Sequence, residues 1–334
     1  MSEPLLDING LRAAFPGPRG PVEAVRGVDF TLEEGEVLGI VGESGSGKSV
    51  AMMALLQLLP EQATVSGSAR FKGRELIGMS RRDIRRIRGR DIGCVFQDPL
   101  SAFNPVLTIG AQIVEAIRLH DRRIGRGAAR SRAIGLLEQV AIPEPERRAQ
   151  QYPHEFSGGM RQRAMIAMAL ANDPALLIAD EPTTALDVTV QAQILDLLRK
   201  LAQERGIGVV LITHDLGVVA GMARDIAVMY GGRVVETGCA EDIFYHSAHP
   251  YTRGLIAAMP KLDRIDEELT PIEGTPPSIF SRPPACSFAP RCTYAQQPCR
   301  ESDPALRAVG PTKTACLRAE ELQDEGPRPR AVGT

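Results

Sequence analysis

The chain has 334 residues, which is enough for one large core with a smaller appended region or for two modest domains. Apolar residues make up 43% of it, an ordinary share for a globular protein. The formal net charge is −2, with acidic and basic residues nearly balanced, and this argues against a dedicated nucleic-acid binder.

The sequence predicts neither export nor a membrane-spanning segment. Residues 1–10 lack a basic stretch followed by an apolar run, so we expect no secretory signal. The best apolar runs, Val37–Val41 and Ala164–Ala171, fall far short of the roughly 20 residues that cross a bilayer. We therefore expect a reducing compartment, in which the six cysteines form no disulfides.

The apolar pattern predicts strands that alternate with helices. Strands are expected at residues 22–30, 36–41, 65–72, 92–96, 175–179 and 208–213. Helices are expected at residues 49–59, 157–172 and 189–204. Residues 101–152 are mostly helical in pattern and rich in arginine, so we expect a helical insertion there. This alternation predicts an α/β fold around a mostly parallel sheet.

The pattern of elements shortens after Gly238. Closely spaced prolines rule out long regular elements there and predict a separate small region; they are Pro271, Pro276, Pro277, Pro283, Pro284 and Pro290. The polar tail at residues 320–334 is expected to be disordered. The expected division is a core at 1–260 with a helical subdomain at about 98–172, a cysteine-containing region at 261–319, and the tail.

Residues 42–49 read Gly-Glu-Ser-Gly-Ser-Gly-Lys-Ser and match the phosphate-binding loop pattern between a buried strand and a helix. Glycines let backbone N–H groups wrap phosphate oxygens, and the helix N-terminus beyond them favours negative charge. Lys48 is expected to reach the β- and γ-phosphates and Ser49 to bind Mg²⁺. The predicted nucleotide-binding residues are Gly42, Ser44, Gly45, Ser46, Gly47, Lys48 and Ser49.

Two further motifs predict nucleotide chemistry. An apolar stretch ends in Asp180 and Glu181, where a strand end would place Asp180 near Mg²⁺ and Glu181 beside the attacking water. Ser157 is a good helix N-cap, and Gly158 and Gly159 expose further backbone N–H groups to an anion. Because one nucleotide needs only one such loop, we expect two subunits to meet head to tail, with each completing the other's site.

The motifs and their order along the chain resemble those of the ATP-binding subunit of ABC transporters over most of residues 5–260. The set comprises residues 42–49, Gln97, 157–159, Asp180–Glu181, Asp187 and His214. The resemblance implies a P-loop ABC ATPase core in which antiparallel N-terminal strands accompany the mostly parallel sheet. It also implies ATP and Mg²⁺ as ligands and, because Glu181 is present, hydrolysis of ATP.

The resemblance implies a role for each matching residue. Phe15 corresponds to the aromatic ring that stacks on adenine, and Asp187 to the loop that communicates across the dimer. His214 corresponds to the histidine that holds the γ-phosphate, and Gln97 to the glutamine that contacts Mg²⁺ and the water. The implied catalytic residues are Glu181, His214 and Gln97, and the implied Mg²⁺ ligands are Ser49, Gln97 and Asp180.

Other motifs resemble the oligopeptide/dipeptide (and nickel) uptake branch, close to its dipeptide-permease ATP-binding subunits of the D type. They are Tyr152-Pro-His154, His249-Pro-Tyr-Thr252 and the C-terminal cysteines. This branch implies uptake of di- or oligopeptides by a complex at the cytoplasmic face of the cell membrane. Its implied partners are a second, different ATPase subunit, two transmembrane permease subunits and an external substrate-binding protein, and no nucleic acid.

Four cysteines cluster near the C-terminus, at Cys286, Cys292, Cys299 and Cys316. Zinc sites usually begin with more closely spaced pairs, whereas four thiolates at wider spacing suit a [4Fe–4S] cluster. The short, proline-rich region has little core of its own and would gain stability from a bound metal centre. We favour the cluster, and zinc and unliganded cysteines remain as alternatives.

A second function fits the same motifs, namely a soluble ABC ATPase that acts on nucleic acid or ribosomes. Such chains usually carry two cassettes or a long coiled coil, and this chain has one cassette and no sustained heptads. The basic run at residues 81–90 could meet nucleic acid or anionic lipid, although a solvated helix explains it better. A P-loop kinase would need neither Ser157–Gly159 nor His214.

Overall fold

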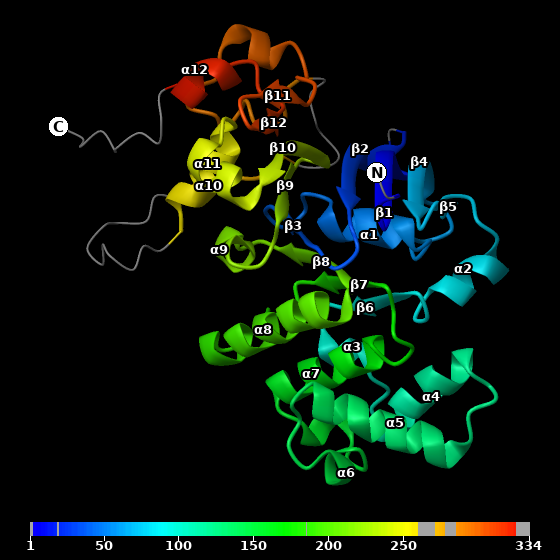
Figure 1. Cartoon of the computed structure of the whole chain (residues 1–334). Coiled ribbons are helices and arrows are strands. Elements are labelled where there is room, and N and C mark those ends of the chain that lie inside the picture. Colours follow the sequence, from blue (N-terminus) through cyan, green and yellow to red (C-terminus); the bar gives the residue numbers. More distant parts are fainter. Residues whose placement is uncertain (1–2, 19, 185, 260–270, 278–284, 325–334) are drawn as a thin grey trace. The chain divides into compact units, whose positions relative to one another are not determined.

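The computed structural model describes residues 3–18, 20–184, 186–259, 271–277 and 285–324 (Figure 1). The chain divides into two compact units. The first unit comprises residues 1–6, 32–37 and 71–212, and the second unit comprises residues 7–31, 38–70 and 213–334. Parts of the expected 261–319 region, at 261–270 and 278–284, and of the expected tail, at 325–334, lie outside the described residues.

Three parallel strands form the centre of the first unit. They are β6 (Ile92–Val95), β7 (Leu176–Asp180) and β8 (Gly208–Thr213), in which Ile92 pairs with Leu176 and Leu176 with Gly208. Almost every residue of these strands is buried, as expected for apolar strands that are covered on both faces. The predicted strands at 92–96, 175–179 and 208–213 are therefore confirmed to within a residue.

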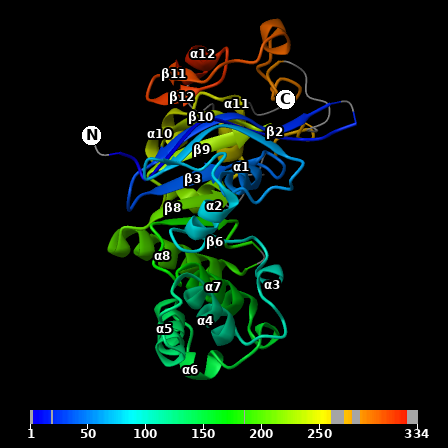
Figure 2. The same cartoon turned by 90° about the vertical axis from the view of Figure 1, so that its right-hand side faces the viewer.

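Only helices lie between β6 and β7, and they group together in both views (Figures 1 and 2). They are α3 (Pro99–Ala102), α4 (Ile109–His120), α5 (Arg126–Gln139), α6 (Pro145–Arg148), the 3₁₀ turn η1 (Pro153–Glu155) and α7 (Gly158–Ala169). Side-chain N-caps start α3, α4 and α7, from Asp98, Thr108 and Ser157. The first unit also contains β5 (Arg74–Glu75), α2 (Arg81–Ile87) and α8 (Val188–Arg205).

The second unit contains two groups of strands. In the first group the order is β2-β1-β4, formed by β1 (Leu6–Phe15), β2 (Val22–Leu32) and β4 (Thr64–Phe71). The second group consists of β3 (Val37–Val41), β9 (Asp225–Tyr230), β10 (Arg233–Cys239), β12 (Thr312–Thr314) and β11 (Arg307–Val309). β3 pairs with β9 in parallel, and the other pairs in this group are antiparallel.

Short helices complete the second unit. They are α1 (Lys48–Leu55), α9 (Leu216–Ala220), α10 (Ala240–His246), α11 (Pro250–Ala257), the 3₁₀ turn η2 (Gln297–Arg300) and α12 (Ala319–Asp324). α1 ends before the predicted position 59, because Gln57 adopts a positive φ of 51°. None of the helices in the described part of the chain is long and apolar enough to cross a membrane.

A buried carboxylate holds the C-terminal hairpin β11–β12 in place. Glu236 on β10 is fully buried and accepts hydrogen bonds from Thr314 Oγ1 at 2.7 Å and Thr312 Oγ1 at 3.2 Å. It also accepts the backbone N–H groups of Ala248, at 2.6 Å, and His249, at 3.2 Å. Burial raises the pKa of Glu236, and these hydrogen bonds oppose the rise. One carboxylate thus joins β10, β12 and the start of α11.

The expectation of a disordered tail from residue 320 is wrong for residues 320–324, which belong to α12. The cause is apolar packing that composition alone does not reveal. Ala319 is fully buried against Ala248 and Val309, and Leu322 is fully buried as well. Burial of these two side chains offsets the entropy cost of ordering a short polar helix.

Candidate nucleotide site and cysteine pocket

The phosphate loop of the second unit follows β3 directly and leads into α1. Gly47 is the N-cap of α1 and has a φ of 97°, a left-handed conformation that favours glycine. A Cβ on Gly47 would lie 2.6 Å from the carbonyl oxygen of Ala24, and one on Gly42 would lie 2.1 Å from that of Met229. The glycines at these two positions are therefore required by close contacts with backbone.

Lys48 holds the loop from inside. Its side chain is buried, and its ammonium group donates hydrogen bonds to the carbonyl oxygens of Gly42, at 2.5 Å, and Glu43, at 3.0 Å. Ser46 is also buried, with its hydroxyl 3.4 Å from the ammonium. The loop therefore curves around one positive charge, next to the backbone N–H groups at the start of α1.

The other predicted nucleotide residues of the second unit lie at the ends of elements. Ser44 and Gly45 are exposed on the loop, and Ser49 lies in the first turn of α1. Phe15 is the half-buried last residue of β1. His214 directly follows β8 and is exposed.

In the first unit the structure brings Gln97 and Glu181 together. The Glu181 carboxylate accepts hydrogen bonds from Gln97 Nε2 and from Thr184 Oγ1, both at 2.9 Å. Glu181 follows Asp180, the last residue of β7, and its own N–H donates to Ile212 O on β8 at 2.9 Å. Its φ is 45°, and a non-glycine residue in this region carries roughly 1–3 kcal/mol of strain. The backbone of Glu181 is thus strained, and its carboxylate is held in one orientation.

The predicted anion cradle opens α7. Ser157 caps the helix by accepting the N–H of Met160 at 3.3 Å, and both Ser157 and Gly158 are exposed. A Cβ on Gly159 would lie 2.6 Å from Cγ1 of Val190, so glycine allows α8 to approach closely. Asp187 caps α8 by accepting the N–H of Val190 at 2.9 Å. Asp187 thus has a structural task in addition to the one that the resemblance implies.

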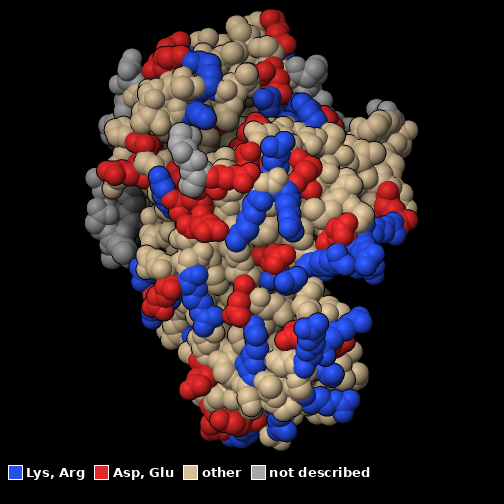
Figure 3. Space-filling view, turned by 45° about the vertical axis from the view of Figure 1, so that its right-hand side comes forward, with Lys and Arg blue, Asp and Glu red and all other residues tan. Residues whose placement is uncertain are grey.

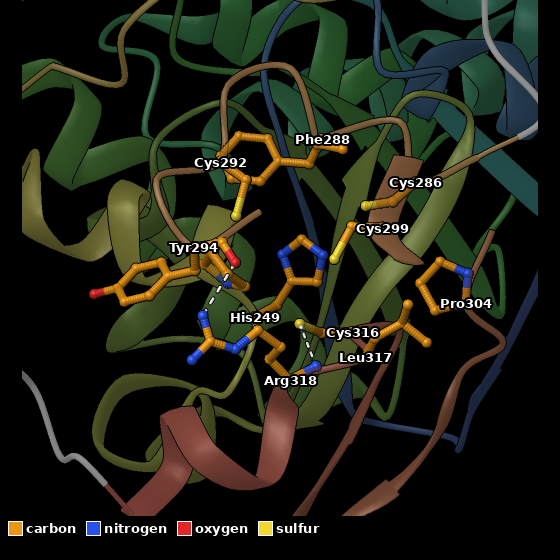
Figure 4. A pocket seen from close by; sticks show the side chains of 12 residues that line it. His249, Cys286, Phe288, Cys292, Tyr294, Cys299, Pro304, Cys316, Leu317 and Arg318 are labelled. Atoms are coloured by element: carbon orange, nitrogen blue, oxygen red, sulfur yellow. Dashed lines mark hydrogen bonds between the residues drawn. The ribbon is translucent and has the colours of Figure 1, made fainter. Parts of the chain in front are cut away.

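All four C-terminal cysteines line one pocket, with their sulfur atoms directed toward the same space (Figure 4). They come from the turns at 285–300 and from the segment after β12. Burial raises the pKa of Cys286, that of Cys292 to about 11 and that of Cys316 to about 12. Thiolates here would need a positive partner, which a metal centre supplies. The four cysteines therefore fit a tetrathiolate metal centre.

The described side chains are not arranged around a single metal ion. Within the described residues, no group of three or more His, Cys, Asp or Glu side chains is placed to hold one metal ion. All six cysteines are free thiols in the structure. A zinc ion draws its sulfur ligands to about 2.3 Å from one centre, whereas an iron–sulfur cluster keeps its thiolates further apart.

His249 lies among the cysteines in the pocket (Figure 4). Its side chain is buried, and its Nδ1 accepts the N–H of Tyr251 at 3.1 Å. Burial lowers the pKa of His249 to about 3, so the imidazole is neutral near pH 7. Because Nδ1 accepts, Nε2 carries the proton.

Sequence reasoning missed several residues that the structure places at these sites. Thr184 lies three residues beyond Glu181, and its hydroxyl could have been noticed from that spacing. Tyr251 and Arg291 contact the phosphate loop at Glu43 from more than 200 positions away. No local sequence signal marks such pairs.

Comparison with known proteins agrees with this geometry. Residues 25–184 match the family "ABC transporter", and residues 235–299 match "Oligopeptide/dipeptide transporter, C-terminal region". The chain belongs to the ABC transporter family, so the resemblance seen in the motifs is confirmed.

Several similar relatives have names that refer to peptide transport. The chain is 50% identical to "Oligopeptide transport ATP-binding protein OppD" of Bacillus subtilis, covering 92% of this chain and 87% of the relative. It is 51% identical to "Dipeptide transport ATP-binding protein DppD" of the same species, covering 87% of each. It is 52% identical to OppD of Mycobacterium tuberculosis over 95% of this chain, yet it spans only 52% of that relative's length.

Solved structures confirm the predicted P-loop ABC ATPase fold. A dimeric ATP-binding cassette in a post-hydrolysis state, bound to ADP and Pi, matches with a TM-score of 0.64 and 30% identity. The match covers 70% of this chain and 98% of that structure.

Two glycines of the phosphate loop provide a matched test of its packing. Alanine at Gly45 meets only the cost of a positive φ, about 1–2 kcal/mol, because nothing lies within 4 Å of its Cβ. Alanine at Gly47 adds a clash with the backbone of Ala24. We therefore expect thermal unfolding of Gly47→Ala at a clearly lower Tm than that of Gly45→Ala. Equal Tm values for the two variants would contradict the described packing.

Proposed function

We propose that this chain is the ATP-hydrolysing subunit of an ABC importer that takes up di- or oligopeptides. The observation that carries the proposal is the phosphate loop, in which the Lys48 ammonium lies inside the loop next to the N-terminus of α1, an arrangement that favours phosphate. The names of the relatives support peptides as the class of substrate.

The phosphate loop residues, Gly42 to Ser49, would hold the phosphates, with Lys48 at the β- and γ-phosphates. Mg²⁺ would be bound by Ser49, Gln97 and Asp180 and would neutralise charge that develops on the phosphates. Glu181 would accept a proton from the attacking water, and its bonds to Gln97 and Thr184 would orient it.

The remaining predicted residues complete the proposal. Phe15 would stack on adenine and His214 would hold the γ-phosphate. Residues 157–159 and Asp187 would serve the nucleotide of a second subunit, and the exposure of Ser157 and Gly158 leaves them open to one. The similar cassette that was solved as a dimer with ADP and Pi supports such pairing.

The names of the relatives, which refer to transport, support a proposal about partners and location. We propose two transmembrane permease subunits, a second and different ATPase subunit, and an external substrate-binding protein as partners. The chain would lie at the cytoplasmic face of the membrane, attached through the permease subunits. The nearly balanced net charge of −2 does not favour the alternative of a nucleic-acid ATPase, although Lys and Arg side chains gather on part of the face shown in Figure 3.

We also propose that Cys286, Cys292, Cys299 and Cys316 hold a [4Fe–4S] cluster. Their convergence in one pocket, with the sulfur atoms directed toward the same space, supports this proposal. Such a centre would supply positive charge that stabilises four half-buried thiolates and would thereby hold together a segment with few regular elements.

Substitution of the proposed base tests the catalytic assignment. In the complex with its membrane subunits, Glu181→Gln should lower ATP hydrolysis about a hundredfold or more while ATP binding is retained, because the amide cannot accept the proton. Glu204→Gln, on the exposed end of α8, is the matched control and should keep wild-type hydrolysis. Full hydrolysis by Glu181→Gln would assign the reaction to another residue or to the partner ATPase.

Metal analysis of the anaerobically purified chain tests the cluster. We expect iron and inorganic sulfide in equal amounts, near four of each per chain, with visible absorbance that Cys316→Ser strongly reduces. Cys239→Ser, outside the pocket, should retain both. Stoichiometric zinc, or no metal at all, would overturn the cluster in favour of the corresponding alternative.

A further inference from the structure

Glu43, the second residue of the phosphate loop, is held at each of its polar groups. Its N–H donates to Tyr251 Oη at 2.8 Å, and its carbonyl oxygen accepts from Ser46 N at 3.2 Å and from Lys48 Nζ at 3.0 Å. Its carboxylate accepts two hydrogen bonds from Arg291, at 2.7 and 3.0 Å. Contacts from outside and inside the loop thus meet at one residue.

Arg291 is itself fixed in place. Its side chain is only 5% exposed, and every guanidinium N–H has an acceptor. Besides Glu43, the acceptors are the backbone carbonyls of Glu273, at 2.8 Å, and Ile272, at 3.1 Å, and the hydroxyl of Tyr230, at 3.3 Å. A buried, fully paired and two-pronged contact of this kind sets geometry far more strictly than a surface ion pair.

The same residues connect to the cysteine pocket by two routes. Arg291 directly precedes Cys292, and its guanidinium lies 6.0 Å from the ring centre of Phe288, which lines the pocket. The second route runs through Tyr251, whose hydroxyl contacts Glu43 and whose N–H donates to His249 in the pocket. The Phe288 ring packs against both Tyr230 and Tyr251, with ring centres 5.2 and 5.5 Å apart.

We propose that Arg291 is a positioning residue for the phosphate loop, through which the ordered cysteine segment raises the affinity for nucleotide. The pair with Glu43 fixes the loop in the conformation whose N–H groups face the phosphates. Anything that orders the segment around Cys292 therefore also orders the loop. By linkage, nucleotide binding strengthens retention of a metal centre by the same factor. This inference rests on the proposed function of the loop as the ATP site.

Equilibrium binding of ADP to the purified chain, by calorimetry, tests the proposal. Loss of a two-pronged charged contact should raise the Kd for ADP about tenfold in Arg291→Gln and in Glu43→Gln. The double variant should be no weaker than either single variant, since both remove one interaction. Arg291→Lys keeps the charge and should recover part of the affinity. Arg300→Gln, an exposed arginine of the same segment, should bind as the wild type does.

Removal of metal from the wild type by a chelator should raise the Kd for ADP by a similar factor, whereas the same treatment of Arg291→Gln should add little. Unchanged ADP affinity in both Arg291→Gln and Arg291→Lys, with the wild type binding ADP, would overturn the positioning role alone. Fully additive losses in the double variant would also overturn it. Failure of the wild type to bind ADP would instead overturn the proposed function and this inference with it.

Discussion

The two-pronged contact between Glu43 and Arg291 is the interaction on which the account of the second unit depends. A loop of glycines and serines has little intrinsic preference for one conformation, and ordering it costs backbone entropy. Lys48 satisfies the loop's carbonyl groups from inside, while Arg291 and Tyr251 hold Glu43 from outside. Together these contacts hold the loop backbone in one conformation, and in our proposal this preorganisation lowers the cost of binding nucleotide.

In the first unit, neighbouring groups likewise fix the conformation of a carboxylate residue, Glu181. Glu181 stands at a positive φ directly after β7, and it keeps this strained conformation because β8, Gln97 and Thr184 all hold it. Strain that neighbouring groups maintain is typical of residues whose orientation matters for a reaction. Gln97 follows β6 and precedes the helices α3 to α7, so the residue that orients the proposed base also begins the helical segment.

Patterns local in the sequence predicted most of what is local in the structure. The apolar strands β6, β7 and β8, the loop at 42–49 and the N-cap at Ser157 depend on neighbours within a few residues. What the sequence could not predict depends on distant partners. Glu236 accepts hydrogen bonds from two threonines that lie 76 and 78 positions away, and Arg291 donates to Glu43 across 248 positions. The order of α12 depends on apolar contacts that its polar composition conceals.

The four cysteines illustrate both cases. Their spacing predicted a shared site, and the structure brings all four to one pocket. The connection from this pocket to the phosphate loop was not visible in the sequence, because the motif at residues 249–252 does not indicate that Tyr251 contacts Glu43, and Arg291 belongs to no motif. Buried side chains that position the phosphate loop without touching a ligand are therefore recognised only in the folded structure.

Amide hydrogen exchange of the phosphate loop, without nucleotide, tests the central claim most directly. In Arg291→Gln the amides of residues 42–48 should exchange at least several-fold faster than in the wild type, because the loop has lost its outer support. The amides of β8 in the first unit, at residues 208–212, should exchange at the wild-type rate. Unchanged protection of residues 42–48 in the variant would show that the loop keeps its conformation without Arg291, and would contradict the account.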